Sequence, residues 1–400
     1  MATENFSKKL IESFFGNIAT FALNLLFPFV ATRLYGSDIL GKYTYGYSIV
    51  MMTIFLATLG LGTGLLYFIP REGNKYITSS FVLNFFASIV ISSVLFVFIK
   101  DSTVRAMLPL IWLLSAEQLF FTIYRAKHSI KEYFLINILC GLCLKIILTV
   151  VLFKIFGVNS VNIIIATYIS VILSLTFYSF KQRKMFGKFV ISKSVIKYSL
   201  PLIIGTMMSV LISQIDVIMI GNMISKQEVA VYNVAAKIAT FPSILLVVLN
   251  TVFPPIVAKL YHDGELDKLR KMYKLSARTL AALSSIIIIL MVIFRENLLG
   301  YYGPEFLRGQ YVIVFRGIGQ LINASVGSVW YIVCMTGRPK VNMAGKVSAG
   351  VINTVLNILL IPVWGITGAA IASMISVGFV NILGYSIVSR ILKVKVYGVV

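Results

Sequence analysis

The sequence predicts an all-α, polytopic membrane protein whose twelve transmembrane helices form two six-helix lobes related as a parallel internal repeat. Three observations carry this prediction: an apolar composition, the recurrence of long apolar segments, and matches between the two halves. Hydrophobic residues make up 58% of the 400 residues and charged residues 12%, against roughly 45–50% and roughly 25% in soluble domains. The mean hydropathy of +0.92 points the same way. This composition excludes a water-soluble domain.

Apolar segments long enough to cross a bilayer recur along the whole chain. A spanning helix needs about 20 mostly apolar residues. The predicted segments lie near 11–32, 44–69, 78–99, 106–124, 133–153, 161–180, 199–223, 230–253, 279–294, 310–334, 341–363 and 366–389.

The distribution of basic residues predicts the orientation. Most of the 36 Lys and Arg residues fall in the segments that face the cytoplasm if the chain starts there, above all in 181–197 and 259–278. Positive residues mark cytoplasmic loops, so we expect both termini in the cytoplasm. The net charge of +22 therefore mainly sets the topology, and the basic residues should also attract anionic lipid headgroups. No nucleic-acid partner is expected.

The sequence shows no signature of a metal site, a disulfide framework or an enzyme. Cys140, Cys143 and Cys334 lie in apolar segments, and the two histidines stand far apart. Neither a phosphate-binding Walker loop nor a paired nucleophile and base is evident, so we expect no cofactor and no enzymatic activity. A glycan polymerase or ligase would place its catalytic residues in a large outer loop, and every predicted outer loop is short.

The two halves of the chain echo each other. Gly16 is followed 27 residues later by Tyr43, and Gly205 is followed 27 residues later by Tyr232. The two pairs are offset by 189 residues. Further on, FGVNSVNIIIATYISV (156–171) matches WGITGAAIASMISV (364–377). The basic stretch between the halves predicts an N-terminal lobe at 1–180, a cytoplasmic linker at 181–198 and a C-terminal lobe at 199–400. Because each lobe has six helices, both begin on the same side, which favours alternating access with a site between the lobes.

Several stretches resemble one transporter family. They are Ser-Leu-Pro at 199–201, the segment from Asp216 to Gly221, Val-Tyr at 231–232, LYGSDILGKYTYGYSIV (34–50) and WGITGAAIAS (364–373). In these the chain resembles the polysaccharide transporters, the Wzx-like O-antigen flippases of the multidrug/oligosaccharidyl-lipid/polysaccharide flippase superfamily.

This resemblance implies a flippase that moves a polyprenyl-diphosphate-linked oligosaccharide from the cytoplasmic to the periplasmic leaflet of the bacterial cytoplasmic membrane. The product would enter O-antigen or another surface polysaccharide. It further implies a cationic lumen, coupling to H⁺ or Na⁺, and a polysaccharide polymerase and a chain-length regulator as partners besides membrane lipids. An ion-coupled multidrug or metabolite exporter of the same superfamily is the alternative, and such an exporter should carry an acidic cavity.

Three charged residues of the second half are predicted at a common depth in the bilayer: Asp216, Lys237 and Arg316. A charge near mid-bilayer costs roughly 2.5–3.5 kcal/mol on insertion scales, so it normally faces a cavity or a partner. Two interpretations stay open for Asp216, besides a partly hydrated position with no role in transport. It forms a structural pair with Lys237 or Arg316, or it lines the cavity and exchanges partners during transport. The first-half residue equivalent to Asp216 is Phe27.

Four further cations complete the predicted cationic lumen. Lys145 lies at the centre of its apolar segment, where snorkelling is difficult, so it is expected to face an anion unless the helix is tilted. Arg125 and Lys127 lie at the cytoplasmic end of the fourth helix. They either only set the orientation of that helix in the membrane or bind the diphosphate as it enters. Arg33 flanks the first outer loop and is a candidate exit contact.

Overall fold

The computed structural model describes residues 2–127, 129–190, 199 and 202–397. Residues 191–198 of the predicted linker and the Leu-Pro part of the Ser-Leu-Pro motif lie outside these ranges. Within them every regular element is a helix and there is no strand, so the all-α prediction is confirmed.

The helices of the first half follow one another with short connections. They are α1 (Ala2–Ala57), α2 (Leu61–Glu72), α3 (Ile77–Phe98), α4 (Ser102–Met107), α5 (Leu110–Ala126), α6 (Ile130–Ile136), the π-helix η1 (Asn137–Cys143), α7 (Leu144–Phe156), α8 (Ser160–Lys181) and the short η2 (Arg183–Met185).

The second half is built in the same way. Its helices are α10 (Leu202–Met223), α11 (Lys226–Ala239), α12 (Ser243–His262), α13 (Leu266–Ile293), α14 (Arg295–Gly300), η3 (Pro304–Gly309), α15 (Gln310–Val326), α16 (Val329–Met335) and α17 (Pro339–Leu392).

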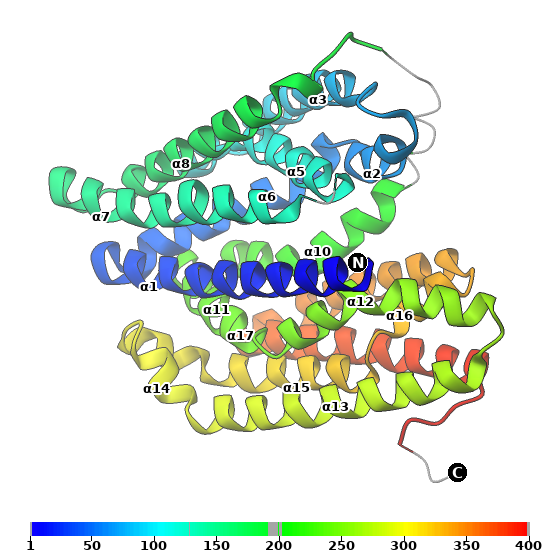
Figure 1. Cartoon of the computed structure of the whole chain (residues 1–400). Helices are drawn as coiled ribbons and strands as arrows, with labels where there is room; N and C mark the ends of the chain where they lie inside the picture. The colour runs from blue at the N-terminus through cyan, green and yellow to red at the C-terminus, as the bar shows by residue number, and fades with distance from the viewer. Residues whose placement is uncertain (1, 128, 191–198, 200–201, 398–400) are drawn as a thin grey trace. The chain divides into compact units, whose positions relative to one another are not determined.

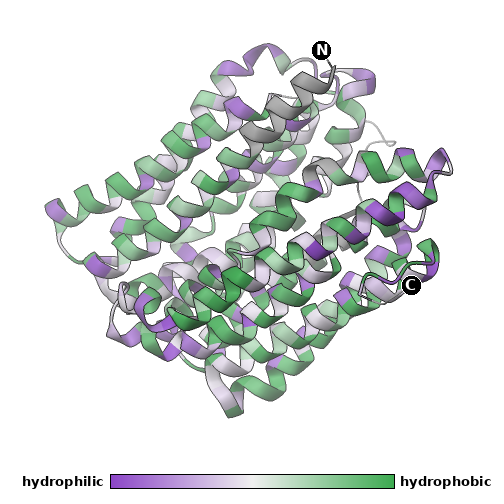
Figure 2. Cartoon of the chain, turned by 60° about the horizontal axis from the view of Figure 1, so that its bottom comes forward, coloured by the Kyte–Doolittle hydropathy of each residue, from purple (hydrophilic) through white to green (hydrophobic). Residues whose placement is uncertain are grey.

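The chain is a multi-pass membrane protein. Within the described residues, seven helices are long and apolar enough to cross a membrane, and nine if each of two bent pairs is one span. Two of the seven, at Phe14–Ala57 and Pro339–Leu392, are 44 and 54 residues long, more than twice the roughly 20 residues of one crossing. The count of twelve stays a prediction. Figure 2 shows hydrophobic residues along the long helices and many of the hydrophilic ones at helix ends and loops.

The chain forms two compact units: unit 1, Met1–Ile218, and unit 2, Met219–Val400. The division falls inside α10, so most of that helix belongs to unit 1. The predicted lobe boundaries at 180 and 199 stay a prediction.

Backbone breaks recur at positions that the sequence repeat makes equivalent. α1 breaks at Gly36, with φ 82° and ψ 167°, and the residue 189 positions later, Ser225, lies in the break between α10 and α11. Gly157 ends α7 with φ 69° and ψ −155°, and its counterpart Gly365 breaks α17 with φ 57° and ψ −137°. Positive φ values of this kind favour glycine. The repeat therefore extends from the sequence to the backbone.

Each unit has its own core. In unit 1, the rings of Tyr133 and Tyr178 stack at 5.3 Å, next to the buried Phe120 and Tyr124, while α7 and α8 lie side by side (Figure 1). In unit 2, α15 packs against both α13 and α17, and Gly319 permits this approach because a Cβ there would lie 3.2 Å from the Cα of Met374.

Candidate functional site

In unit 1, Lys145 on α7 lies in a cage of aromatic rings. Its Nζ donates a 2.7 Å hydrogen bond to Tyr43 Oη. The same Nζ lies 3.7, 4.8 and 5.4 Å from the ring centroids of Phe27, Tyr43 and Tyr47, all on α1. An ammonium within about 6 Å of an aromatic face gains up to about 2 kcal/mol where it is desolvated. The cage therefore offsets part of the cost of holding this charge in an apolar segment.

The position of this lysine follows from local structure. Gly36 breaks α1, and Tyr43 lies two turns into the helix that resumes. Tyr43 Oη also lies 3.1 Å from Thr167 Oγ1 on α8, and both residues are buried. Lys145 follows the π-helix η1 by two residues. A π-turn is wider than an α-turn and re-aims the residues beyond it, so η1 contributes to the direction of Lys145.

In unit 2, Arg316 on α15 has closely similar partners. Its Nη1 donates to Tyr232 Oη at 2.7 Å and to Ser373 Oγ at 3.2 Å. Tyr232 and Ser373 are buried, and Asn353 Nδ2 also donates to Ser373 Oγ, at 3.4 Å. Tyr232 is fixed early in α11, whose N-cap Ser225 accepts a hydrogen bond from the backbone N–H of Glu228.

The two clusters are related by the sequence repeat. Tyr43 and Tyr232 are the two tyrosines at the 189-residue offset, and Thr167 and Ser373 occupy the same position in the matching stretches ATYISV and ASMISV. The cations come from different helices, α7 in unit 1 and α15 in unit 2. Each unit therefore holds a cation on a repeat-related tyrosine. The repeat-related hydroxyl bonds the tyrosine in unit 1 and the cation in unit 2. We name these the Lys145 cluster (Lys145, Tyr43, Thr167) and the Arg316 cluster (Arg316, Tyr232, Ser373).

The phenol and hydroxyl groups of the two clusters are neutral and help to orient the cations. Both cations are half-buried, and both have further interactions. Ammonium and guanidinium groups with fixed orientation suit phosphate oxygens, and the guanidinium offers a planar, forked arrangement of donors. The arrangement is chemically suited to an anion.

The other predicted site residues have different surroundings. Arg33 and Arg125 are exposed and lie 5.8 and 5.5 Å from the rings of Phe29 and Phe121. Lys127 is exposed at the end of α5. Lys237 is half-buried in the last turn of α11, next to the 58° bend toward α12. Asp216 is fully buried and has interaction partners.

Sequence reasoning missed a carboxylate in unit 1. Glu117 lies within α5, half-buried, and its Oε1 accepts a 3.1 Å hydrogen bond from Asn137 Nδ2 in the π-helix. The signal was available, because Glu117 stands in the apolar run LLSAEQLFF and intramembrane carboxylates are functional candidates. Tyr43 and Tyr232 were recognised as repeat markers but not as site residues.

The described residues contain no group of three or more His, Cys, Asp or Glu side chains that could hold a metal ion. Within this part of the chain, the chemistry of the two clusters is therefore that of organic cations, phenols and hydroxyls.

Comparison with protein families gives two matches. The model of the family described as "Polysaccharide biosynthesis protein" matches residues 6–261, and the model named MatE matches residues 201–361.

Two similar curated proteins are from Haloferax volcanii. The probable low-salt glycan biosynthesis flippase Agl15 is 21% identical over 206 residues, which are 51% of this chain and 43% of the relative. The probable flippase AglR is 25% identical over 181 residues, which are 43% and 37%. The aligned part thus spans less than half of each relative.

Solved structures with the same fold are transporters. An inward-facing multidrug resistance MATE family transporter of the MOP superfamily gives a TM-score of 0.75 at 15% identity, over 94% of both chains. An outward-facing structure of such a transporter gives 0.71 at 14% identity, over 97% of this chain and 95% of that one. A MOP superfamily transporter from Pyrococcus furiosus gives 0.68 at 13% identity, over 97% and 95%. At these identities the likeness concerns the fold.

Proposed function

Because the chain belongs to the polysaccharide biosynthesis protein family, we propose that it is a flippase that translocates a polyprenyl-diphosphate-linked oligosaccharide across the membrane by alternating access. The names of two relatives, both described as probable flippases and one as acting in glycan biosynthesis, support this assignment. The fold shared with both an inward-facing and an outward-facing transporter supports the alternating-access part.

The observation that carries the proposal is the pair of repeat-related cation clusters. A diphosphate diester brings about two negative charges into a region where an unpaired charge is costly. Charge-assisted hydrogen bonds from ammonium and guanidinium groups replace the lost hydration of such a group. The Lys145 cluster and the Arg316 cluster supply one cation in each unit, so we infer that both contact the diphosphate during the transport cycle.

We further propose a specific substrate, membrane location and set of partners. The substrate is the repeat unit of O-antigen or another surface polysaccharide, and the protein lies in the cytoplasmic membrane of a bacterium with both termini in the cytoplasm. A polysaccharide polymerase and a chain-length regulator act with it, and an H⁺ or Na⁺ gradient drives it. Asp216, the repeat equivalent of Phe27, is the candidate coupling residue. Arg33, Arg125, Lys127 and Lys237 are secondary contacts along the path of the headgroup.

The experiment that tests the proposal is a measurement of lipid-linked glycans in cells that lack the protein. Accumulation of one polyprenyl-diphosphate oligosaccharide on the cytoplasmic leaflet is the expected result. Wild type should clear this pool, and so should the control variants Lys154→Gln and Arg338→Gln, whose side chains are exposed. Lys145→Gln and Arg316→Gln should leave it uncleared at equal membrane levels. A pool that never accumulates would refute the flippase assignment.

A second candidate is an ion-coupled exporter of drugs or metabolites, favoured by the MatE match and by the multidrug transporters of the same fold. Cells that lack the protein would then become sensitive to cationic dyes. Purified protein in vesicles would transport such a dye when an ion gradient is imposed, and would transport it in the opposite direction when that gradient is reversed. The cationic clusters argue against this candidate because a cationic cargo would be repelled by them.

A further inference from the structure

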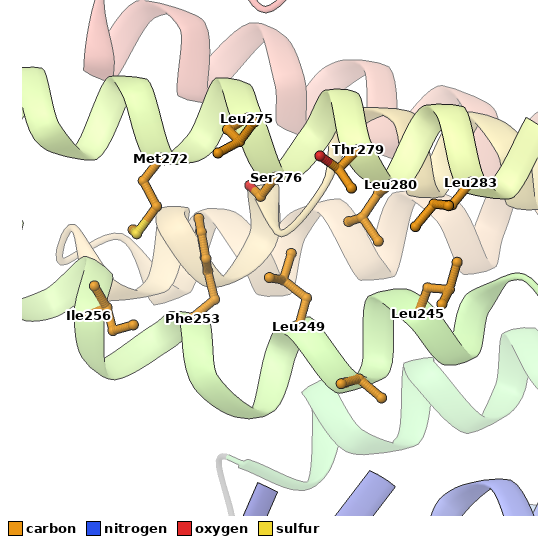
Figure 3. A pocket seen from close by; sticks show the side chains of 11 residues that line it. Leu245, Leu249, Phe253, Ile256, Met272, Leu275, Ser276, Thr279, Leu280 and Leu283 are labelled. Carbon is orange, nitrogen blue, oxygen red and sulfur yellow. The ribbon is translucent and has the colours of Figure 1, made fainter. Parts of the chain in front are cut away.

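A long apolar groove runs between α12 and α13 in unit 2 (Figure 3). Its volume is about 480 Å³. Helix α12 contributes Leu245, Val248, Leu249, Phe253 and Ile256, and α13 contributes Met272, Leu275, Ser276, Thr279, Leu280 and Leu283.

The residues from α13 form one stripe along that helix. Met272, Ser276, Leu280 and Leu283 recur at spacings of three and four, which places them on a single face. The stripe is not sealed: Leu275 and Leu283 are 69% and 44% exposed, and on the opposite wall Ile256 is 37% exposed. The groove is therefore an open apolar trough in a membrane-spanning part of the chain.

One end of the groove is basic. The two helices are antiparallel and joined at 263–265, so the end of α12 meets the start of α13. Lys259 lies one turn beyond Ile256 on α12. Lys268 and Lys271 lie one turn before Met272 and Leu275 on α13. All three lysines are exposed, and Lys268 forms an ion pair of 3.1 Å with Glu265 at the surface.

The two neighbouring arginines of α13 bind backbone carbonyls. Arg270 Nε donates to the carbonyl of Leu392, and Arg278 Nε donates to the carbonyl of Val396. Both therefore fasten the C-terminal end of unit 2 to α13. The lysines on the groove side have no such role, and within the described chain Lys259 and Lys271 form no side-chain hydrogen bond or ion pair.

We propose that this groove binds an anionic phospholipid of the surrounding membrane, with an acyl chain along α12 and α13 and the phosphate at Lys259, Lys268 and Lys271. An acyl chain suits the lining, whose polar side chains are Ser276 and Thr279, and the Ser276 hydroxyl already donates to the carbonyl of Tyr273. Basic residues between transmembrane helices at the membrane surface attract anionic headgroups. The lipid fills the gap between the two helices and is independent of the transported cargo.

The test is lipid binding by the full-length protein in detergent, measured by native mass spectrometry with added phosphatidylglycerol or phosphatidylcholine. Wild type should retain phosphatidylglycerol in preference to phosphatidylcholine. Leu275→Trp places a bulky ring at the mouth of the groove and should reduce the retention of both lipids severalfold. Ile286→Trp, on the same helix but outside the groove and 57% exposed, is the matched control and should retain both.

A charge variant tests the headgroup separately. Lys268→Gln/Lys271→Gln should lower the preference for phosphatidylglycerol about thirtyfold at low ionic strength, the factor expected for two lysines near a membrane surface. Arg338→Gln/Lys340→Gln removes the same charge from exposed positions at the start of α17 and should preserve the preference. Equal retention of the two lipids by wild type, or equal behaviour of test and control variants, would overturn the proposal. Because both lysines are exposed, this result does not depend on how well Leu275→Trp folds.

Discussion

Tyr43 and Tyr232 stand 189 residues apart in the sequence, and each accepts a 2.7 Å hydrogen bond from a cation of its own unit. The donor is Lys145 in unit 1 and Arg316 in unit 2, and these cations are not at equivalent positions. The acceptor is thus retained in the repeat while the donor is supplied by different helices. Such an arrangement indicates that a cation at this place in each unit matters more than the helix that carries it.

Tyr43→Phe removes the hydroxyl of Tyr43 and keeps its ring, so it tests the hydrogen bond to Lys145 apart from the cation–π contact. The phenylalanine ring keeps the cation–π contact with Lys145 but loses the hydrogen bond, which for a charged donor is worth about 1.5–3 kcal/mol. We expect clearance of the lipid-linked glycan to slow about tenfold or more, with the thermal unfolding temperature in detergent lowered by a few degrees. Tyr67→Phe, an exposed tyrosine in the middle of α2, is the control. Clearance at the wild-type rate by Tyr43→Phe would show that the hydroxyl has no role in transport.

Arg316→Lys keeps the charge of the Arg316 cluster but not its geometry. The guanidinium nitrogen Nη1 bonds both Tyr232 and Ser373. A lysine ammonium sits on a shorter stem and lacks the further nitrogens that a guanidinium offers to an anion. We therefore expect partial clearance by Arg316→Lys and none by Arg316→Ala, at equal membrane levels. The rates of glycan clearance in intact cells measure the difference. Full activity of Arg316→Lys would mean that the charge alone suffices.

Gly36→Ala tests the break in α1. With φ 82° and ψ 167°, Gly36 occupies a backbone region that is essentially restricted to glycine. No atom lies within 4 Å of a Cβ built there, so backbone strain is the only cost. We expect a loss of about 1–3 kcal/mol in the free energy of unfolding, followed by chemical denaturation in detergent micelles.

Gly300→Ala is the matched control for this substitution. A Cβ at Gly300 also meets nothing within 4 Å, but its φ is not in the positive range, so the substitution should be neutral or slightly stabilising. If both variants unfold at the same denaturant concentration as wild type, the break at Gly36 does not require glycine.

The predicted orientation is open to cysteine labelling. After replacement of Cys140, Cys143 and Cys334 by alanine, Asp267→Cys should react with a membrane-impermeant maleimide only in opened cells, because α13 begins in the basic cytoplasmic segment. Asp38→Cys, in the predicted outer loop, should react in intact cells. The Asp267 and Asp38 side chains are 89% and 60% exposed, so accessibility to the reagent is set by the side of the membrane. The opposite pattern would invert the topology.

Much of the fold was predictable because it depends on composition and spacing. An apolar backbone in a bilayer must satisfy its hydrogen bonds internally, so long apolar segments become helices. The repeat was visible in short matches, and the same positions later proved to be backbone breaks, as at Gly157 and Gly365. The breaks at Gly36 and Gly365 fall between segments that the sequence predicts as separate spans. The π-helix before Lys145 was not predicted, since it depends on how neighbouring helices pack.

The sequence predicts which charged residues lie inside the membrane, but not which side chains they contact. Lys145 and Arg316 are predictable site residues because they lie too deep in apolar segments to be ordinary loop residues. Glu117 also lies in an apolar run, but its role as a partner of Asn137 follows only from the structure. The sequence by itself determined the membrane class, the two-fold repeat and the presence of intramembrane charges, because each is a property of composition or spacing. Only the tertiary structure decided that Lys145 turns to Tyr43 and Arg316 to Tyr232. A helix that is apolar on all sides has no amphipathic pattern to fix its rotation, so packing within each unit sets the direction of every charged side chain.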